Sequence, residues 1–193
     1  MKIYIDGTWN TPADRSNIVK LHEKYGGHYF NGPGTKAFFL DKIFGGAFGL
    51  GTQDIVDKAF DLYQGRTDDE PVHIFGFSRG AAAARMLAAR ICGDGGEVDG
   101  LLCFDTVGAF GIPVNILGIP FQTINLFHDM NVSPQVKHAF HAQALLEKRP
   151  AFVGTPMKER PGVVQKGFNG DHWYVGSSAE TFKWMEKKMK VIR

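Results

Sequence analysis

The sequence has little cysteine, no excess of charge of one sign and no long uninterrupted apolar run. Two thiols, Cys92 and Cys103, cannot build a disulfide framework, and we expect both to be free and buried in a reducing compartment. Lys and Arg total 22 against 20 Asp and Glu, a formal net charge of +2, so we expect no nucleic-acid partner. The most apolar stretch, 106–127, contains Pro113 and Pro120, which disfavour a membrane-spanning helix.

The N-terminal residues do not have the pattern of a secretion signal. An acidic residue, Asp6, arrives before any apolar region of signal-peptide length, so we expect a cytoplasmic protein unless a signal-independent system exports it. At 193 residues the chain is predicted to form a single domain over 1–193. The sequence gives no prediction of oligomeric state.

Short apolar segments rich in β-branched and aromatic residues alternate with segments of helical periodicity. This alternation predicts an α/β fold of minimal size, with a mainly parallel sheet and helices on both faces. Residues 26–36 are glycine-rich and are predicted to form a loop. The predicted strands are 2–6, 71–77, 100–104 and a weak one within 163–176, and the predicted helices are 14–25, 52–65, 81–91, 134–147 and 178–190.

Polar side chains directly follow three of these predicted strands. They are Asp6, Ser78 and Asp105, and His172 is predicted to lie in a turn after the last strand. The carboxyl ends of parallel strands meet at one edge of a sheet, where α/β proteins bind their ligands. We therefore expect these four residues to lie close together.

The segment Gly76-Phe77-Ser78-Arg79-Gly80 fits the pattern G-x-S-x-G between an apolar strand and an alanine-rich helix. In a nucleophile elbow of this kind, a strained turn pushes the serine hydroxyl clear of the sheet. The pattern therefore predicts Ser78 as a nucleophile. The alternative is a purely structural glycine-rich turn.

A nucleophilic serine needs a base and a group that orients the base. Of the four histidines after Ser78, His172 lies late in the sequence between glycines, as the chain order Ser, Asp/Glu, His requires. Asp105 is predicted as the orienting acid because it ends a strand soon after the nucleophile. Asp129 and Asp171 are the alternative acids.

The turn after the first strand is a candidate oxyanion hole. The amide of Gly7 or Thr8 is predicted to act with the amide of Arg79, the residue after the nucleophile. Asp6 would brace this turn by accepting backbone amides. The alternative is a simple Asx-type turn.

Aromatic and apolar residues near these groups are candidates for substrate contact. Trp9, Phe77 and Tyr174 are predicted to bind the substrate. Residues 109–134 form an apolar segment after the candidate acid and are predicted as a cap. Within it, 110–127 is a candidate lipid or membrane-surface contact, and the alternative is a buried core connection.

No cofactor or metal is predicted. The aspartates and His172 form one conceivable metal site, but no H-E-x-x-H, H-x-H or C-x-x-C spacing supports it. His138 and His141 are spaced i, i+3 on a predicted helix, which is a common arrangement without a metal.

An ordered set of motifs resembles a known family. The motifs are DGTWN at 6–10, YFNGPGT at 29–35, GFSRGA at 76–81, FDTVGA at 104–109, HAQALLEKRPAF at 141–152 and GDHWYVG at 170–176. Together they are similar to the α/β-hydrolase domain that forms the catalytic part of type VI secretion phospholipase effectors, over nearly the whole chain. The last motif departs from the family pattern, since Tyr174 stands where an aspartate is usual and Ser177 where a glycine is usual.

This resemblance implies a lipase or esterase with Ser78 as nucleophile, Asp105 as acid and His172 as base, and some family members cleave phospholipids. We therefore expect a serine hydrolase that cleaves carboxylic esters of small molecules or lipids, without a cofactor. The alternatives are a catalytically weakened scaffold that binds a partner, suggested by Tyr174, and a metal-assisted phosphodiesterase. Thioester or amide substrates are a further alternative within the same mechanism.

Overall fold

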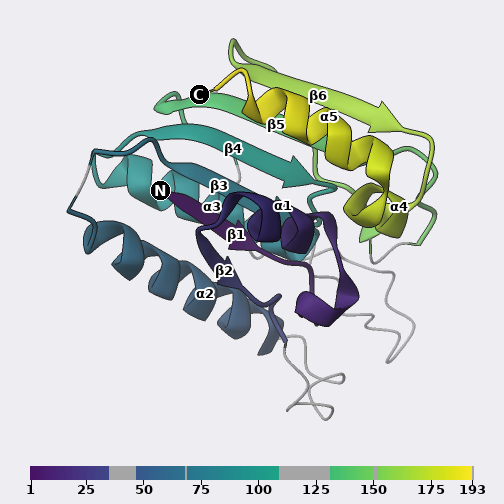
Figure 1. The fold of residues 1–193 in the computed structure, drawn as a ribbon, viewed down its shortest axis with the longest axis horizontal. Helices are drawn as coiled ribbons and strands as arrows, with labels where there is room; N and C mark the ends of the chain where they lie inside the picture. Colours follow the sequence, from purple (N-terminus) through teal and green to yellow (C-terminus); the bar gives the residue numbers. More distant parts are fainter. Residues whose placement is uncertain (35–46, 68, 109–130, 150–151, 193) are drawn as a thin grey trace, which may run out of the picture.

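A computed structural model describes residues 1–34, 47–67, 69–108, 131–149 and 152–192. Six strands form one sheet in the order β2-β1-β3-β4-β5-β6, and every neighbouring pair is parallel (Figure 1). Parallel strands need crossover connections, and those that join the first four strands in chain order each contain a helix. The predicted α/β class with a parallel sheet is confirmed.

The elements follow the sequence pattern closely at most positions. The strands are β1 (Lys2–Ile5), β2 (His28–Phe30), β3 (His73–Phe77), β4 (Val98–Phe104), β5 (Val136–Ala144) and β6 (Val163–Phe168). The α-helices are α1 (Asn17–Tyr25), α2 (Ala47–Gln64), α3 (Arg79–Gly93), α4 (His172–Ser177) and α5 (Ala179–Met189), and a 3-10 turn, η1, spans Pro12–Asp14.

Helices cover both faces of the sheet, with one apolar core on each side. On one side, residues of α2 and α3 pack on Ile3, Ile74 and Leu101. On the other, residues of α1, α4 and α5 pack on Tyr4 and Phe75 (Figure 1). Successive residues of β1 and of β3 thus point to opposite cores, as the period of two in a strand requires.

The prediction of a helix over 134–147 is wrong, because this segment contains strand β5. β5 pairs with β4 on one side and β6 on the other, and residues 139–142 are buried. Polar and apolar residues do not alternate in the buried stretch 139–142, and periodicity cannot distinguish so short a buried segment from part of a helix. His138 and His141 therefore lie on a strand.

Besides the 3-10 turn η1, one short strand and one short α-helix were not predicted. β2 lies within the predicted loop 26–36, where it extends the sheet beside β1. α4 begins at His172, which was expected in a turn. Each is too short for its apolar residues to show the repeat that is typical of a strand or of a helix.

Several expectations concern features other than the sheet. Cys92 and Cys103 are free and buried, as predicted. Among the described residues, none of the helices combines the length and the apolarity needed to cross a bilayer. The predicted cap at 109–134 falls mostly on 109–130, outside the described residues, so it stays a prediction, as does the candidate acid Asp129.

Candidate active site

Ser78 lies in a strained turn between β3 and α3. Its φ and ψ are 59° and −126°, a region that a residue with a side chain rarely occupies. A Cβ on Gly80 would lie 2.1 Å from the carbonyl oxygen of Asp6, and one on Gly76 would lie 2.5 Å from Cα of Ala81. Only glycine permits this approach of helix and strands, so the G-x-S-x-G spacing follows from packing.

The main chain of Ser78 is tied to the neighbouring strand end. Its amide donates to the Phe104 carbonyl at 3.0 Å, and its carbonyl accepts from the Val107 amide at 3.1 Å. These bonds bracket Asp105, so the turn after β3 and the turn after β4 are held as one unit.

Asp105 directly follows β4 and is 2% exposed. Its φ of 38° again places a non-glycine residue in the left-handed region. One carboxylate oxygen, Oδ1, accepts the Ala144 amide at 2.9 Å, and the other, Oδ2, lies 2.7 Å from Nδ1 of His172. A buried carboxylate in this position favours the His172 tautomer that carries its proton on Nδ1.

His172 is the first residue of α4. Asp171 caps this helix by accepting the Tyr174 amide at 2.8 Å, so the alternative acid has a structural partner of its own. The His172 ring stacks on Phe77 at 4.8 Å between centroids and contacts Phe152 at 4.9 Å. Two rings and one carboxylate therefore fix the orientation of the imidazole.

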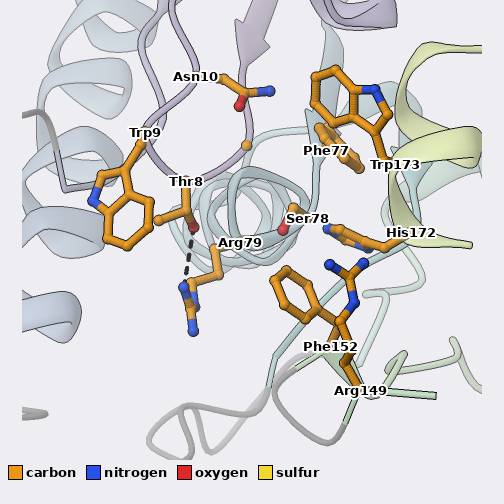
Figure 2. Close-up of a pocket in the computed structure, with 11 residues that line it drawn as sticks. Thr8, Trp9, Asn10, Phe77, Ser78, Arg79, Arg149, Phe152, His172 and Trp173 are labelled. Atoms are coloured by element: carbon orange, nitrogen blue, oxygen red, sulfur yellow. Dashed lines mark hydrogen bonds between the residues drawn. The ribbon is translucent and has the colours of Figure 1, made fainter. Parts of the chain in front are cut away.

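Ser78 and His172 face one cavity of about 330 Å³ at the carboxyl edge of the sheet. Figure 2 shows the His172 ring extending toward Ser78 inside it. Its lining comprises Gly7, Thr8, Trp9, Asn10, Phe77, Ser78, Arg79, Arg149, Phe152, His172 and Trp173. The structure thus brings the predicted nucleophile, the predicted base and the predicted oxyanion loop together.

The loop after β1 is organised around the buried carboxylate of Asp6. Its oxygens accept from the Gly7 amide at 2.7 Å, Ser16 Oγ at 2.7 Å, Tyr29 Oη at 2.8 Å and Asn10 Nδ2 at 3.1 Å. Burial raises the pKa of Asp6, and these four hydrogen bonds act in the opposite direction. The predicted bracing role of Asp6 therefore has a specific geometry.

One of the two predicted loop donors is already engaged. The Gly7 amide donates to Asp6, which assigns it to the loop rather than to the cavity. Thr8 is the other candidate, and Arg79 Nη1 donates to its hydroxyl at 3.3 Å (Figure 2). The Arg79 side chain thus ties the loop after β1 to the first turn of α3.

The three predicted substrate contacts are placed differently. Trp9 and Phe77 line the cavity, and Trp9 is 46% exposed at its mouth. Tyr174 does not line the cavity; its hydroxyl donates to Glu180 Oε2 at 2.8 Å. The Tyr174 hydroxyl thus has a partner on α5, and the substrate contact predicted for this residue stays a prediction. The departure from the family pattern at this position also leaves the contact between His172 and Asp105 intact.

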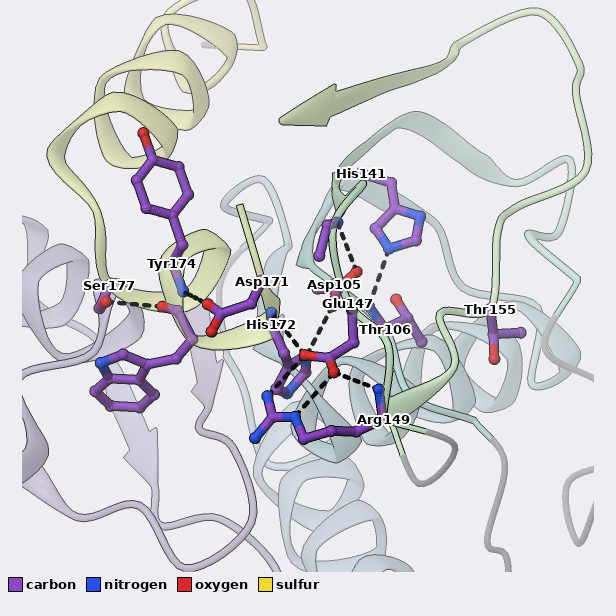
Figure 3. A network of polar contacts seen from close by, with 12 residues as sticks. Asp105, Thr106, His141, Glu147, Arg149, Thr155, Asp171, His172, Tyr174 and Ser177 are labelled. Carbon is purple, nitrogen blue, oxygen red and sulfur yellow. Dashed lines mark hydrogen bonds and ion pairs between the residues drawn. The ribbon is translucent and has the colours of Figure 1, made fainter. Parts of the chain in front are cut away.

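Sequence reasoning gave no role to Glu147 and Arg149, which follow β5. The Glu147 side chain is 7% exposed and accepts from Arg149 Nε at 2.8 Å, Arg149 Nη2 at 2.7 Å and the His172 amide at 3.1 Å (Figure 3). The hydrogen bond from Arg149 is the main cause that lowers the Glu147 pKa. The one sequence feature that pointed to them was the charged run 147–149 inside the motif at 141–152.

Another unassigned residue, His141, holds the turn after Asp105. It is fully buried, its Nε2 accepts the Thr106 amide at 3.0 Å, and its Nδ1 lies 3.2 Å from Gln165 Oε1 (Figure 3). Burial lowers the His141 pKa to about 4, so the ring is neutral at pH 7. A neutral ring is required for Nε2 to accept the Thr106 amide.

The conceivable metal site does not assemble in the described part of the chain. There, no group of three or more His, Cys, Asp or Glu side chains could hold an ion. Asp6 is instead surrounded by hydrogen-bond donors, Asp105 is bonded to His172, and Asp171 caps α4. All three aspartates thus have hydrogen-bond partners within the protein.

Comparison with known proteins finds one matching family model. It is described as the catalytic domain of Tle1-like phospholipase effectors of the type VI secretion system, and it matches residues 1–96 and 89–190. No curated protein is significantly similar in sequence to this chain.

Solved structures with a similar fold include three of interest. The Tle1 effector bound to the VgrG spike of the type VI secretion system is 19% identical with a TM-score of 0.57, over 91% of this chain and 50% of that one. An α/β-hydrolase superfamily protein from Xanthomonas campestris pv. campestris is 11% identical with a TM-score of 0.60, over 98% of each chain. A structure of the metagenome-derived lipolytic enzymes LipS and LipT is 14% identical with a TM-score of 0.56, over 100% of this chain and 92% of that one. These likenesses show an α/β-hydrolase fold, and the chain spans about half the length of the effector.

Proposed function

Because this chain belongs to the family of Tle1-like catalytic domains of type VI secretion phospholipase effectors, we propose that it hydrolyses carboxylic esters, with Ser78 as the nucleophile. One observation carries the proposal. A serine in a strained strand–helix turn shares a cavity with a histidine whose Nδ1 lies 2.7 Å from a buried carboxylate. This combination supports an activated nucleophile.

In the first step, Ser78 Oγ attacks the acyl carbonyl carbon while Nε2 of His172 takes the hydroxyl proton. Asp105 holds the imidazole with its Nδ1 proton and stabilises the imidazolium that forms. The described residues have no hydrogen bond from Ser78 to His172, and such bonds commonly tighten when substrate binds. The stacked ring of Phe77 and the tilted ring of Phe152 hold the imidazole in place beside Ser78.

The tetrahedral intermediate carries negative charge on the former carbonyl oxygen. The amides of Arg79, at the start of α3, and of Thr8 are the donors we assign to it. His172 then protonates the leaving alcohol, and the carbon–oxygen bond to it breaks. Water, deprotonated by His172, attacks the acyl carbon of the acyl-Ser78 ester. The bond from that carbon to Ser78 Oγ breaks, His172 returns the proton to Oγ, and the carboxylic acid leaves.

The test is hydrolysis of 4-nitrophenyl esters, from acetate to palmitate, by the purified chain. We expect turnover that is insensitive to EDTA and that falls by at least about 10³-fold in Ser78→Ala. Ser133→Ala is the matched control, because Ser133 lies just before β5, at the opposite edge of the sheet. The profile over chain length assigns the enzyme as an esterase or a lipase.

A fluorophosphonate probe provides a second measurement that needs no correct substrate. It should label the wild-type chain and Ser133→Ala, and should not label Ser78→Ala. Equal turnover in Ser78→Ala, or failure of both turnover and labelling in the wild type, would overturn the proposal and favour the scaffold alternative. Loss of turnover with EDTA would favour the metal-assisted alternative.

A further inference from the structure

The cavity around Ser78 contains positive charge and no carboxylate among its described lining residues. Two guanidinium groups, those of Arg79 and Arg149, line it beside aromatic rings. The nearby carboxylates of Asp105 and Glu147 are almost fully buried behind other side chains and do not line the cavity. A substrate in this cavity therefore meets cationic and aromatic groups.

Arg149 is held in a fixed orientation at the mouth of the cavity. Its Nε and Nη2 donate to Glu147 in a bidentate pair, and its guanidinium lies over the Phe152 ring at 4.2 Å from the centroid. Figure 2 shows the guanidinium reaching toward His172. A planar group fixed by a carboxylate and a ring loses little freedom when it binds a ligand.

The pairing with Glu147 leaves one edge of the guanidinium available. Glu147 engages Nε and Nη2, and in the described part of the chain Nη1 has no hydrogen-bond acceptor. The Arg149 side chain is 55% exposed, so this edge can be reached from solvent as well as from the cavity. Glu147 thus neutralises the Arg149 charge and orients the guanidinium through Nε and Nη2, while Nη1 stays available to a ligand.

We propose that Arg149 binds an anionic group of the substrate, which makes the site selective for esters that carry a phosphate or carboxylate near the scissile bond. The inference rests on the proposed ester hydrolysis at Ser78. Guanidinium groups recognise planar or tetrahedral oxyanions through charge-assisted hydrogen bonds. Arg149 is on this argument a specificity-determining residue that acts beside the reacting atoms.

The test compares substrates that differ only in charge. Mono-4-nitrophenyl adipate is compared with 4-nitrophenyl hexanoate, and dihexanoylglycerol phosphate with dihexanoylglycerol. We expect the wild-type ratio of kcat/KM, anionic over neutral, to be about tenfold or more for at least one pair, as a charged hydrogen bond at a half-exposed site allows. This ratio should decrease as salt is added, because salt screens exposed charges.

Variants separate recognition from folding. Arg149→Met should bring the ratio close to one, and Arg149→Lys should retain part of it, because the charge stays while the bidentate pair is lost. Lys148→Met is the matched control, since it removes an exposed cation one residue away that does not line the cavity. Its ratio should equal that of the wild type.

The outcomes distinguish this inference from the proposed function. Hydrolysis with a ratio near one for both pairs, or a ratio that Arg149→Met leaves unchanged, overturns the role of Arg149 alone. An absence of both hydrolysis and fluorophosphonate labelling overturns the proposed function itself. Selectivity confined to the phosphate pair identifies a lipid-type phosphate, and selectivity confined to the adipate pair identifies a soluble carboxylate.

Discussion

Asp105 and His172 face each other through Oδ2 and Nδ1, 2.7 Å apart, although they are 67 positions apart in the sequence. The second carboxylate oxygen of Asp105 accepts the Ala144 amide at the end of β5. A single buried side chain thus orients the candidate base with one oxygen and anchors the neighbouring strand end with the other.

Replacing Asp105 with Asn should separate these two roles. An asparagine keeps an oxygen for the Ala144 amide, so the fold should persist, but its amide cannot accept the Nδ1 proton of His172. We expect kcat on an ester substrate to fall by about 10³-fold or more, measured at saturating substrate. The labelling rate of Ser78 by a fluorophosphonate should fall with it.

Asp171→Asn is the control for that experiment. Asp171 was the alternative acid, but it caps α4, and asparagine is an equally good N-cap. Activity within about threefold of the wild type is expected, since capping changes are small against the transition-state effects at issue. If Asp171→Asn lost as much activity as Asp105→Asn, the assignment of Asp105 would be wrong.

The two glycines of α3 should respond in opposite ways to alanine. In Gly80→Ala the new Cβ would lie 2.1 Å from the Asp6 carbonyl oxygen, so we expect the free energy of unfolding to drop by about 2–3 kcal/mol. A Cβ on Gly93, at the end of the same helix, meets nothing within 4 Å. Gly93→Ala should therefore stabilise the protein by about 0.5 kcal/mol.

Urea unfolding of both variants measures this difference. A midpoint for Gly80→Ala equal to that of the wild type would contradict the close approach of α3 to β1. The slope of the free energy of unfolding against urea concentration should be the same for both variants and the wild type, which checks that a two-state comparison is valid.

His141 should make the protein less stable in mild acid. Its pKa in the folded protein is lowered to about 4, below its ordinary value of 6.5, because burial disfavours the charged ring. Between these two pH values the unfolded chain binds a proton that the folded chain does not. The contribution of the neutral His141 ring to the free energy of unfolding is therefore complete above about pH 6.5. It is lost progressively as the pH falls toward 4.

His141→Gln tests this sign. Glutamine can accept the Thr106 amide but does not titrate, so the His141 contribution to the pH dependence should vanish. The measurement is the free energy of unfolding at several pH values for both proteins. The difference between them should change between pH 6.5 and 4 with a slope of at most about 1.4 kcal/mol per pH unit. A constant difference over that range would argue against a neutral buried ring.

Glu147 should act as a positioning residue for the N-terminus of α4. It accepts the His172 amide and three donors of Arg149, and Glu147→Gln would place an amide N–H against one of these donors. We expect the free energy of unfolding to decrease by about 1–3 kcal/mol and kcat/KM to decrease with it. Glu159→Gln, at an exposed site, is the matched control and should change neither quantity.

A purely structural role for Glu147 would lower the melting temperature and leave the pH profile of kcat/KM in place. A shift in the pH at which activity appears, relative to the Glu159→Gln control, would instead show that Glu147 affects the His172 environment. Both readouts come from the same preparation.

Local sequence determined much of the fold and the candidate nucleophile. An apolar strand followed by G-x-S-x-G and an alanine-rich helix has one compatible geometry, because only glycine fits where α3 approaches the strands. Asp6, Ser78 and Asp105 each follow a strand, so a parallel sheet necessarily gathers them at one edge. Patterns of apolar, polar and glycine residues within short segments were sufficient to predict these features.

The tertiary structure decided what periodicity could not. β5 is covered on both faces, so its sequence did not distinguish strand from helix, and His141 was placed on the wrong element. The Gly7 amide bonds to Asp6, and the pair of Glu147 with Arg149 reaches the His172 amide. Such contacts join residues distant in sequence or depend on how loops turn, and their geometry is set by packing of the whole sheet, which short-range patterns do not encode.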